Sequence, residues 1–347
     1  MLRLTLPLSQ PFQTVRGSER ERRLCVLRVV TPDSEGWGEC AALNEPGYTA
    51  EWADGAADVV ERTLAPRLLR GEPFVDVEHP MASAALRLAV LDARLRAAGT
   101  SLATHLGATT ERVRSGIALG LDATLDDVAR AIEDRYHRVK LKIAPGHDVA
   151  LVRAVRNQWP DLLLQVDANG AYGIADADHL AALDDLEVLF IEQPLAVDDL
   201  DGHAQLARRL RTPICLDESI TSLAAARDAL ERGSCSVVCV KQGRLGGLEE
   251  AVALHDHCRA AGVPAWCGGM IESGLGRAAN LALAALPGFS LPGDLSASSR
   301  WFPEDLTDPL ELDDQGYLAV PTAPGLGVSP RPDALARFTE SHVTVRP

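Results

Sequence analysis

Aromatic and basic side chains are scarce in this chain of 347 residues. Aromatic residues make up 4%, and 34 lysines and arginines stand against 49 aspartates and glutamates, a formal net charge of −15. Nucleic acid is not an expected partner, because phosphate binding requires a basic surface. No apolar run reaches the roughly 18 residues of a membrane span, and the first residues alternate like a strand instead of forming a signal peptide. We therefore expect a cytoplasmic protein that binds no membrane.

The seven cysteines lack the spacing of a zinc site or a disulfide framework. None belongs to a CxxC pair, and several stand inside apolar, strand-like runs. This pattern predicts reduced thiols in the core of a protein from a reducing compartment. At 46% hydrophobic and 24% charged residues, the chain has the composition of a globular protein with a large core.

The first 110 residues predict a separate α+β unit. A strong strand over 24–30 is followed by a turn rich in Pro, Asp, Ser and Gly and by a return strand. Helical patterns then cover 50–69 and 83–98. Residues 10–23, polar and containing glycine, are expected to form a mobile loop between the first two strands.

From residue 111 to 304 strands and helices alternate in the manner of a parallel barrel. Eight strand candidates are separated by intervals long enough for helical crossovers, and no GxGxxG motif follows the first of them, which argues against a dinucleotide fold. The candidates cover 114–120, 139–143, 162–167, 188–192, 213–217, 235–241, 264–268 and 289–294. The tail, 305–347, contains a strand-like run over 316–320, and we expect the tail to return to the first unit.

Three successive strand candidates end in a carboxylate, at Asp167, Glu192 and Asp217, each 25 residues from the next. The carboxyl ends of barrel strands meet at one rim, so the three side chains should converge. Three like charges at one place are costly unless a cation neutralises them. Because hard oxygen ligands suit Mg²⁺, the spacing predicts a magnesium site. The alternative is that each acid is an isolated surface or helix-capping residue.

Lysines flank these acids. Lys140 and Lys142 share one strand face by alternation, and Lys241 ends a strand on the opposite side of the predicted metal. An unpaired lysine is costly inside an apolar strand, although salt bridges or solvation remain an alternative. The pattern indicates acid/base chemistry on a small-molecule carboxylate, with burial and a nearby cation lowering the lysine pKa. Removal of a proton alpha to the carboxylate would give an enediolate, with elimination from one face or racemisation between two.

Five motifs carry a resemblance to a known family: Lys140-x-Lys142, Asp167-Ala168-Asn169, Glu192-Gln193-Pro194, Asp217-Glu218-Ser219 and Lys241-x-Gly243-Arg244. With them the chain resembles the enolase superfamily, and specifically its muconate-lactonizing-enzyme subgroup. The stretches 36–40, 267–274 and 291–294 look like the family of o-succinylbenzoate synthases and N-succinylamino acid (N-acylamino acid) racemases.

The resemblance implies an α/β fold, a modified TIM barrel (β/α)₇β over 111–304. It also implies an α+β capping domain from residues 1–110 and the tail 305–347. Mg²⁺, or Mn²⁺ in its place, would bind the three acids.

The same resemblance implies a role for each motif residue. Lys142 is the base on one face, and Lys241 is the second base or a cation that stabilises the intermediate. Lys140 assists, and Asn169 lies near metal and substrate. Three more residues are implied near the substrate: Gly269 and Met270 in the acyl pocket, and Arg244 beside Lys241.

The implied activity is o-succinylbenzoate synthesis, a dehydration in menaquinone biosynthesis, with promiscuous N-succinylamino acid racemisation. A dedicated N-acylamino acid racemase, a dipeptide epimerase or a cycloisomerase stay open, as does a catalytically silent metal-binding barrel. Asp294-Leu295-Ser296 is one acid short of the epimerase pattern, and Trp266-Cys267-Gly268 lacks the histidine base of mandelate-racemase relatives. We also expect a homo-oligomer. In addition, residues 12–20 and 46–48 are expected to close over the barrel mouth.

Overall fold

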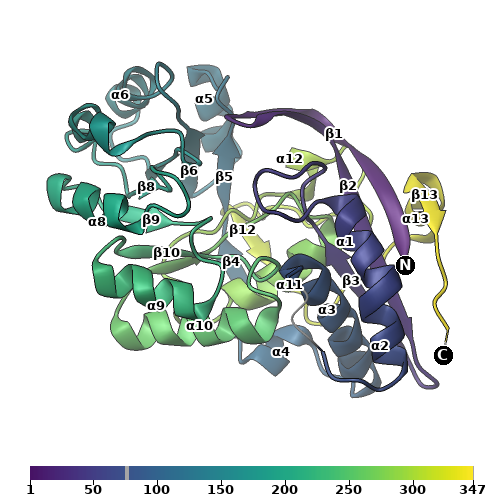
Figure 1. Ribbon diagram of the computed structural model, residues 1–347. Coiled ribbons are helices and arrows are strands. Elements are labelled where there is room, and N and C mark those ends of the chain that lie inside the picture. The colour runs from purple at the N-terminus through teal and green to yellow at the C-terminus, as the bar shows by residue number, and fades with distance from the viewer. Residues whose placement is uncertain (75–77, 347) are drawn as a thin grey trace.

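The two ends of the chain build one antiparallel sheet beside a barrel (Figure 1). The computed structural model describes residues 1–74 and 78–346. The sheet has the order β13-β1-β2-β3. Its strands are β1 (Leu2–Thr14), β2 (Gly17–Val30), β3 (Glu35–Cys40) and β13 (Thr339–His342). The cap predicted from both termini is therefore present.

The mobile loop predicted for residues 10–23 is wrong. The β1–β2 hairpin continues through this stretch, with a register shift between Pro7 and Phe12 and Thr14 paired with Gly17. The polar sequence gave no sign of a strand, because a single apolar residue anchors this part of the hairpin. Phe12 is buried and packs edge-on against Trp301, with 5.0 Å between ring centroids. The hairpin tip at Arg16 consequently reaches the barrel mouth.

The helical segments that follow β3 are α1 (Ala53–Val59), the π-helical turn η1 (Val60–Leu64), α2 (Ala65–Leu69), α3 (Pro80–Ala97) and α4 (Leu102–Leu106). Of these, α1 and α3 pack on the cap sheet, whereas α4 contacts α3 and α11. The predicted helix over 50–69 is thus one helical run with a π-turn inside it. A Cβ on Gly36 or Gly38 would lie only 2.2 or 2.1 Å from a backbone oxygen of α3. These two glycines in β3 therefore allow the close packing of α3 on the strand.

Seven parallel strands form the barrel wall in sequence order. They are β5 (Gly116–Leu119), β6 (Arg138–Lys142), β7 (Leu164–Asp167), β8 (Ile191–Glu192), β9 (Ile214–Leu216), β10 (Val237–Val240) and β11 (Ala265–Cys267). Residues 289–294 close the ring through isolated parallel bridges from Phe289 to Ala265 and from Gly293 to Ser115. The predicted eight-membered barrel is confirmed, with its last member reduced to two bridges.

Helices of the crossovers lie outside this ring (Figure 1). They are α5 (Leu125–Glu133), α6 (Val149–Gln158), α7 (Ala177–Leu180) between the 3₁₀ turns η2 (Ile174–Asp176) and η3 (Ala181–Leu183), α8 (Leu200–Arg209), α9 (Leu223–Arg232), α10 (Leu248–Ala261) and α11 (Gly274–Ala284). Apolar side chains from both layers form one continuous core. Burial of this kind supplies most of the folding free energy.

The tail makes two strand pairings. The strand-like run over 316–320 is β12 (Tyr317–Ala319), which pairs with β4 (Arg112–Arg114) and not with the cap sheet. After α12 (Ser298–Trp301) and α13 (Pro332–Phe338), β13 makes the return by pairing with β1. The exact domain boundaries stay predictions.

Two composition-based expectations can be compared with the fold. All seven cysteines are buried and unpaired, as predicted. Among the residues that the structure describes, no helix has the length and apolar character to cross a membrane.

Candidate active site

Barrel topology places two lysines on opposite walls. β6, which carries Lys142, and β10, which ends just before Lys241, are four positions apart in a ring of eight. The three acids stand on the walls between them, at the ends of β7 and β8 and just after β9. All five side chains are buried. The arrangement brings together the residues that the sequence predicted.

Lysine is used nowhere else in this chain. The sequence contains three lysines among its 34 basic residues, at 140, 142 and 241, and all others are arginines. An arginine guanidinium stays protonated in proteins, whereas a lysine amine can lose its proton and act as a base. The restriction of lysine to the rim where the acids converge therefore favours proton transfer at this place.

Lys140 acts as a fixed counter-ion for the acids. Its Nζ lies 3.0 Å from Glu192 Oε2 and 3.3 Å from Asp167 Oδ2, and it also pairs with Asp294. Burial alone would lower its pKa, but Asp294, Glu192 and Asp167 raise the pKa well above the ordinary value. Lys140 therefore carries a positive charge between the carboxylates.

Lys142 is oriented by the turn that follows β7. Its Nζ lies 2.6 Å from both Asp167 Oδ2 and Asn169 Oδ1. Asn169 has a φ of +43°, in the left-handed region that asparagine tolerates better than most residues. Its amide Nδ2 also donates to Glu218 Oε1 at 2.9 Å. Asn169 thus lies beside the predicted base, and its place near metal and substrate stays a prediction.

Lys241 shares its environment with a tyrosine from the cap. Tyr48 Oη accepts from Lys241 Nζ and from Arg244 Nη1, each at 2.7 Å, and donates to Asp217 Oδ2 at 2.8 Å. The hydroxyl uses its one donor and both acceptor positions. Arg244 is therefore linked to Lys241 through Tyr48, and the capping loop over 46–48 contributes to the site.

Burial by itself does not produce the expected fall in pKa at Lys241. Burial does lower its pKa, but the carboxylate of Asp217 outweighs this effect and raises the pKa well above the ordinary value. In turn, although burial opposes it, Arg244 and Lys241 hold the pKa of Asp217 well below its usual range. A divalent cation on the same carboxylates would oppose this stabilisation of the ammonium.

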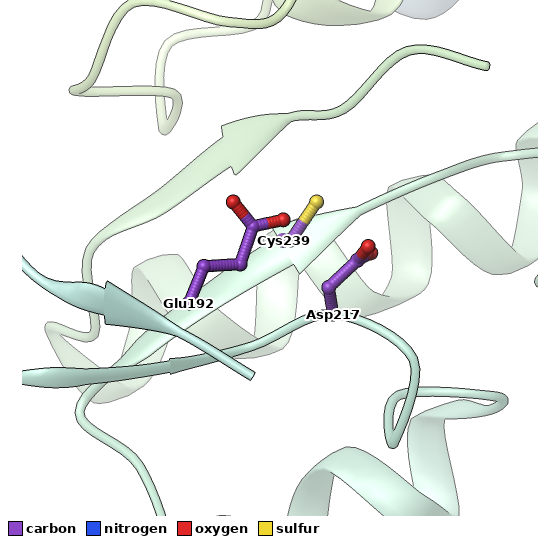
Figure 2. A group of neighbouring side chains, drawn as sticks. All are labelled: Glu192, Asp217 and Cys239. Carbon is purple, nitrogen blue, oxygen red and sulfur yellow. The ribbon is translucent and has the colours of Figure 1, made fainter. Parts of the chain in front are cut away.

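Donor atoms for a cation gather at the barrel rim. Glu192, Asp217 and Cys239 each place one ligand atom within 4.8 Å of the others (Figure 2). Asp167 lies outside this set, with its Oδ2 held by Lys142. Glu192 Oε1 is buried without a hydrogen-bond partner among the described residues, whereas Asp217 Oδ1 is ion-paired with Arg244 Nη1 at 2.7 Å. The orphaned oxygen of Glu192 fits a hard divalent cation, because burial without a partner is costly.

A cavity of about 540 Å³ opens above these residues. Lys142, Asn169 and Lys241 line it together with Gly269 and Met270, the two residues predicted for the acyl pocket. Arg244 is buried behind Lys241 instead of lining this cavity. The space admits a small substrate between the two lysines.

Sequence reasoning missed several residues of the site. Arg16, at the hairpin tip, lies 3.3 Å from Glu218 Oε1 and 5.4 Å from the ring centre of Tyr48. Nothing local in the sequence connects these cap residues with the barrel. Cys239 could have been found, because strand alternation places it on the same face as Lys241.

Two buried cap residues of opposite charge hold the loop that carries Gly269 and Met270. Arg22 Nη2 donates to the carbonyl oxygen of Met270 at 3.2 Å. Glu39 accepts from the backbone N of Ser273 at 2.9 Å and of Gly276 at 3.2 Å, at the start of α11. The cap thereby fixes both ends of this part of the cavity wall.

Glu39 should make stability depend on pH. Burial raises its pKa from 4.5 to about 7, with hydrogen bonds from Ser273 opposing this and the charge of Glu272 adding to it. The folded state then binds the proton more tightly, so the free energy of unfolding falls as pH rises from 4.5 towards 7. The loss should be roughly 3 kcal/mol. Glu39→Gln is expected to remove this slope, measured by urea unfolding near pH 5 and pH 8.

Glu250→Gln, on the exposed side of α10, is the matched control and should keep the wild-type slope. An unchanged slope in Glu39→Gln would show that Glu39 does not titrate in this interval.

The comparisons with known proteins agree with this architecture. Residues 123–334 match the family model described as enolase C-terminal domain-like. A member of the enolase superfamily from Listeria innocua superposes with a TM-score of 0.92 at 38% identity, covering 98% of this chain and 96% of that one. Muconate lactonizing enzyme from Pseudomonas fluorescens, complexed with muconolactone, gives 0.91 at 25% identity, with 98% and 97% covered. Fold and site together define an enolase-superfamily barrel.

Two curated relatives indicate to which family within this superfamily the chain belongs. An N-succinylamino acid racemase of Amycolatopsis sp. is 49% identical over 358 residues, covering 99% of this chain and 97% of its own. An o-succinylbenzoate synthase of Geobacillus kaustophilus is 42% identical over 352 residues, covering 97% and 94%. The chain is an enzyme that belongs to the o-succinylbenzoate synthase and N-succinylamino acid racemase family of the enolase superfamily, which confirms the resemblance seen in its motifs.

Proposed function

We propose that this enzyme removes the proton alpha to a substrate carboxylate, giving an enediolate, in a reaction that depends on Mg²⁺ or Mn²⁺. Its main reaction is the dehydration that forms o-succinylbenzoate, and the same site racemises N-succinylamino acids. One observation carries the proposal: Lys142 and Lys241 stand on opposite barrel walls, with three buried carboxylates on the strands between them.

Asp167, Glu192 and Asp217 would hold the cation. The orphaned oxygen of Glu192 supports its part in this role. When bound, the ion supplies positive charge that stabilises negative charge on the substrate carboxylate as the proton leaves.

The lysines divide the proton transfers. Lys142 takes the alpha proton on its face of the cavity, held in place by Asp167 and Asn169. In dehydration the same lysine can return the proton to the departing hydroxyl, so a single base is sufficient. In racemisation Lys241 delivers a proton to the opposite face. Its ammonium form, favoured by Asp217, suits donation and also stabilises the anion during dehydration.

The eighth barrel position argues against a free amino group on the substrate. A dipeptide epimerase would need unpaired carboxylates there to bind an ammonium. Asp294 already pairs with Arg138 and Lys140, and the next two residues are leucine and serine. An acylated amine, which carries no charge, fits this wall better. Cytoplasmic location and a homo-oligomeric state stay predictions.

The proposal is tested by comparing kcat/KM for three substrates with metal-stripped enzyme and added Mg²⁺. The succinyl-bearing cyclohexadiene carboxylate should be turned over fastest, an N-succinylamino acid more slowly and an unacylated dipeptide not at all. The 49% identical racemase favours a second candidate, a dedicated racemase. The reverse order of the first two substrates would support it. Turnover of neither would contradict the proposed chemistry.

A further inference from the structure

Cys239 places a thiol among the candidate metal ligands. It lies on β10, two residues before Lys241, and its side chain is fully buried. One ligand atom each from Cys239, Glu192 and Asp217 lie within 4.8 Å of one another, and Figure 2 shows the three side chains turned toward a common space. The proposed Mg²⁺ chemistry gives this thiol no role.

One carboxylate oxygen of this group has no partner in the part of the chain that the structure describes. Glu192 Oε1 is buried without a hydrogen-bond partner among the described residues, whereas Asp217 Oδ1 is ion-paired with Arg244 at 2.7 Å. A sulfur and two carboxylates differ chemically from the three carboxylates proposed for Mg²⁺. Thiolates select thiophilic ions, whereas Mg²⁺ prefers oxygen alone.

We propose that Glu192, Asp217 and Cys239 form a site for a thiophilic divalent cation such as Zn²⁺ or Cd²⁺, which overlaps the Mg²⁺ site. Binding forms a metal–sulfur bond and breaks the S–H bond, with the proton released to solvent and no change of oxidation state.

The donor geometry requires only small movements. A tetrahedral Zn²⁺ with bonds of about 2.1 Å to oxygen and 2.3 Å to sulfur holds such donors about 3.6 Å apart. Donor atoms that now lie within 4.8 Å of one another can reach this separation by side-chain rotations that move them by about 1 Å. Water would complete the fourth position.

The two ions should exclude each other. Both need Glu192 and Asp217, so a thiophilic ion would occupy two of the three acids proposed for Mg²⁺. It would therefore act as an inhibitor that competes with Mg²⁺. Inhibition rests on the proposed function, whereas binding of the thiophilic ion does not.

The test is a Cd²⁺ titration of the metal-stripped enzyme. Calorimetry measures binding, and the ultraviolet charge-transfer band of a cadmium–thiolate bond reports whether the thiol is a ligand. One equivalent should bind and produce the band, and excess Mg²⁺ should remove it. Cys239→Ser should lose the band and bind Cd²⁺ at least about tenfold more weakly, since even outer ligand partners contribute that much. Cys235→Ser, a buried cysteine just before the same strand, is the matched control and should behave as wild type.

A band that persists in Cys239→Ser, or that Mg²⁺ does not displace from the wild type, would overturn the proposal. The displacement experiment needs no variant, so it decides the matter even if Cys239→Ser folds poorly. A band that behaves as expected in an enzyme inactive on every substrate tested would support the thiophilic site and contradict the proposed function.

Discussion

Replacing Lys142 by alanine is expected to lower kcat by a factor of about 10²–10⁴, the usual contribution of a positioned base. The amine that we propose as the base is lost, while the carboxylates at the rim remain. Because Asp167 keeps Lys140 as a partner at 3.3 Å, the variant should still fold and bind Mg²⁺. Steady-state kcat and KM on both proposed substrates measure the effect.

Lys142→Arg separates the base from the charge. It keeps a cation beside Asp167 but cannot deprotonate in the working pH range. If Lys142 only paired with the acids, arginine would restore most of the activity. Our account predicts that both variants are similarly inactive, and restoration by arginine would contradict it.

Glu192→Gln is expected to weaken Mg²⁺ binding by at least about 10–100-fold, because even outer-sphere partners contribute that much to metal affinity. The variant keeps the side-chain shape but removes the charge and one carboxylate oxygen of Glu192, whose Oε1 has no hydrogen-bond partner among the described residues. Activity at limiting Mg²⁺ should fall in parallel and recover in part at high Mg²⁺. Calorimetry of Mg²⁺ binding and the dependence of rate on Mg²⁺ concentration measure both effects.

Glu218→Gln provides the matched control. Glu218 is equally buried and also has an unpaired oxygen, Oε2, but it was not predicted as a ligand. It should retain more of the Mg²⁺ affinity than Glu192→Gln. The opposite ranking would move the metal site from Glu192 to Glu218.

The barrel could be predicted because its repeat is local. Each strand and crossover is marked by a short apolar run and a helical stretch, and the 25-residue spacing puts equivalent residues at equivalent positions. The same periodicity identified Asp167, Glu192 and Asp217, since a residue at the carboxyl end of a barrel strand necessarily faces the rim.

The cap side of the site could not be predicted in this way. Tyr48 and Arg16 reach the barrel from segments more than 150 residues away in sequence, through contacts with Asp217 and Glu218. Their placement depends on the β1–β2 hairpin and on docking of the cap, which no local pattern encodes. The sequence predicted only that these segments cover the mouth, without naming the residues that reach the site.

Electrostatics also required the structure. The sequence suggested that burial and a nearby cation would lower the pKa of the lysines predicted to be catalytic, but it could not give the number of carboxylates around each one. Lys140 is surrounded by three acids and Lys241 contacts Asp217, so attraction outweighs burial for both. The sequence did contain a stronger indication of where the site lies, because the chain has three lysines and all three stand at this rim.

Exchange of the alpha proton in D₂O tests the central claim most directly. NMR monitors this exchange for each enantiomer of an N-succinylamino acid, with Mg²⁺ bound to the enzyme. The wild type should exchange and racemise both enantiomers. Lys241→Ala should still exchange, without inversion, the enantiomer whose proton faces Lys142, and Lys142→Ala should lose that exchange. Unchanged exchange of both enantiomers by Lys142→Ala would contradict the assignment of two lysines acting on opposite faces.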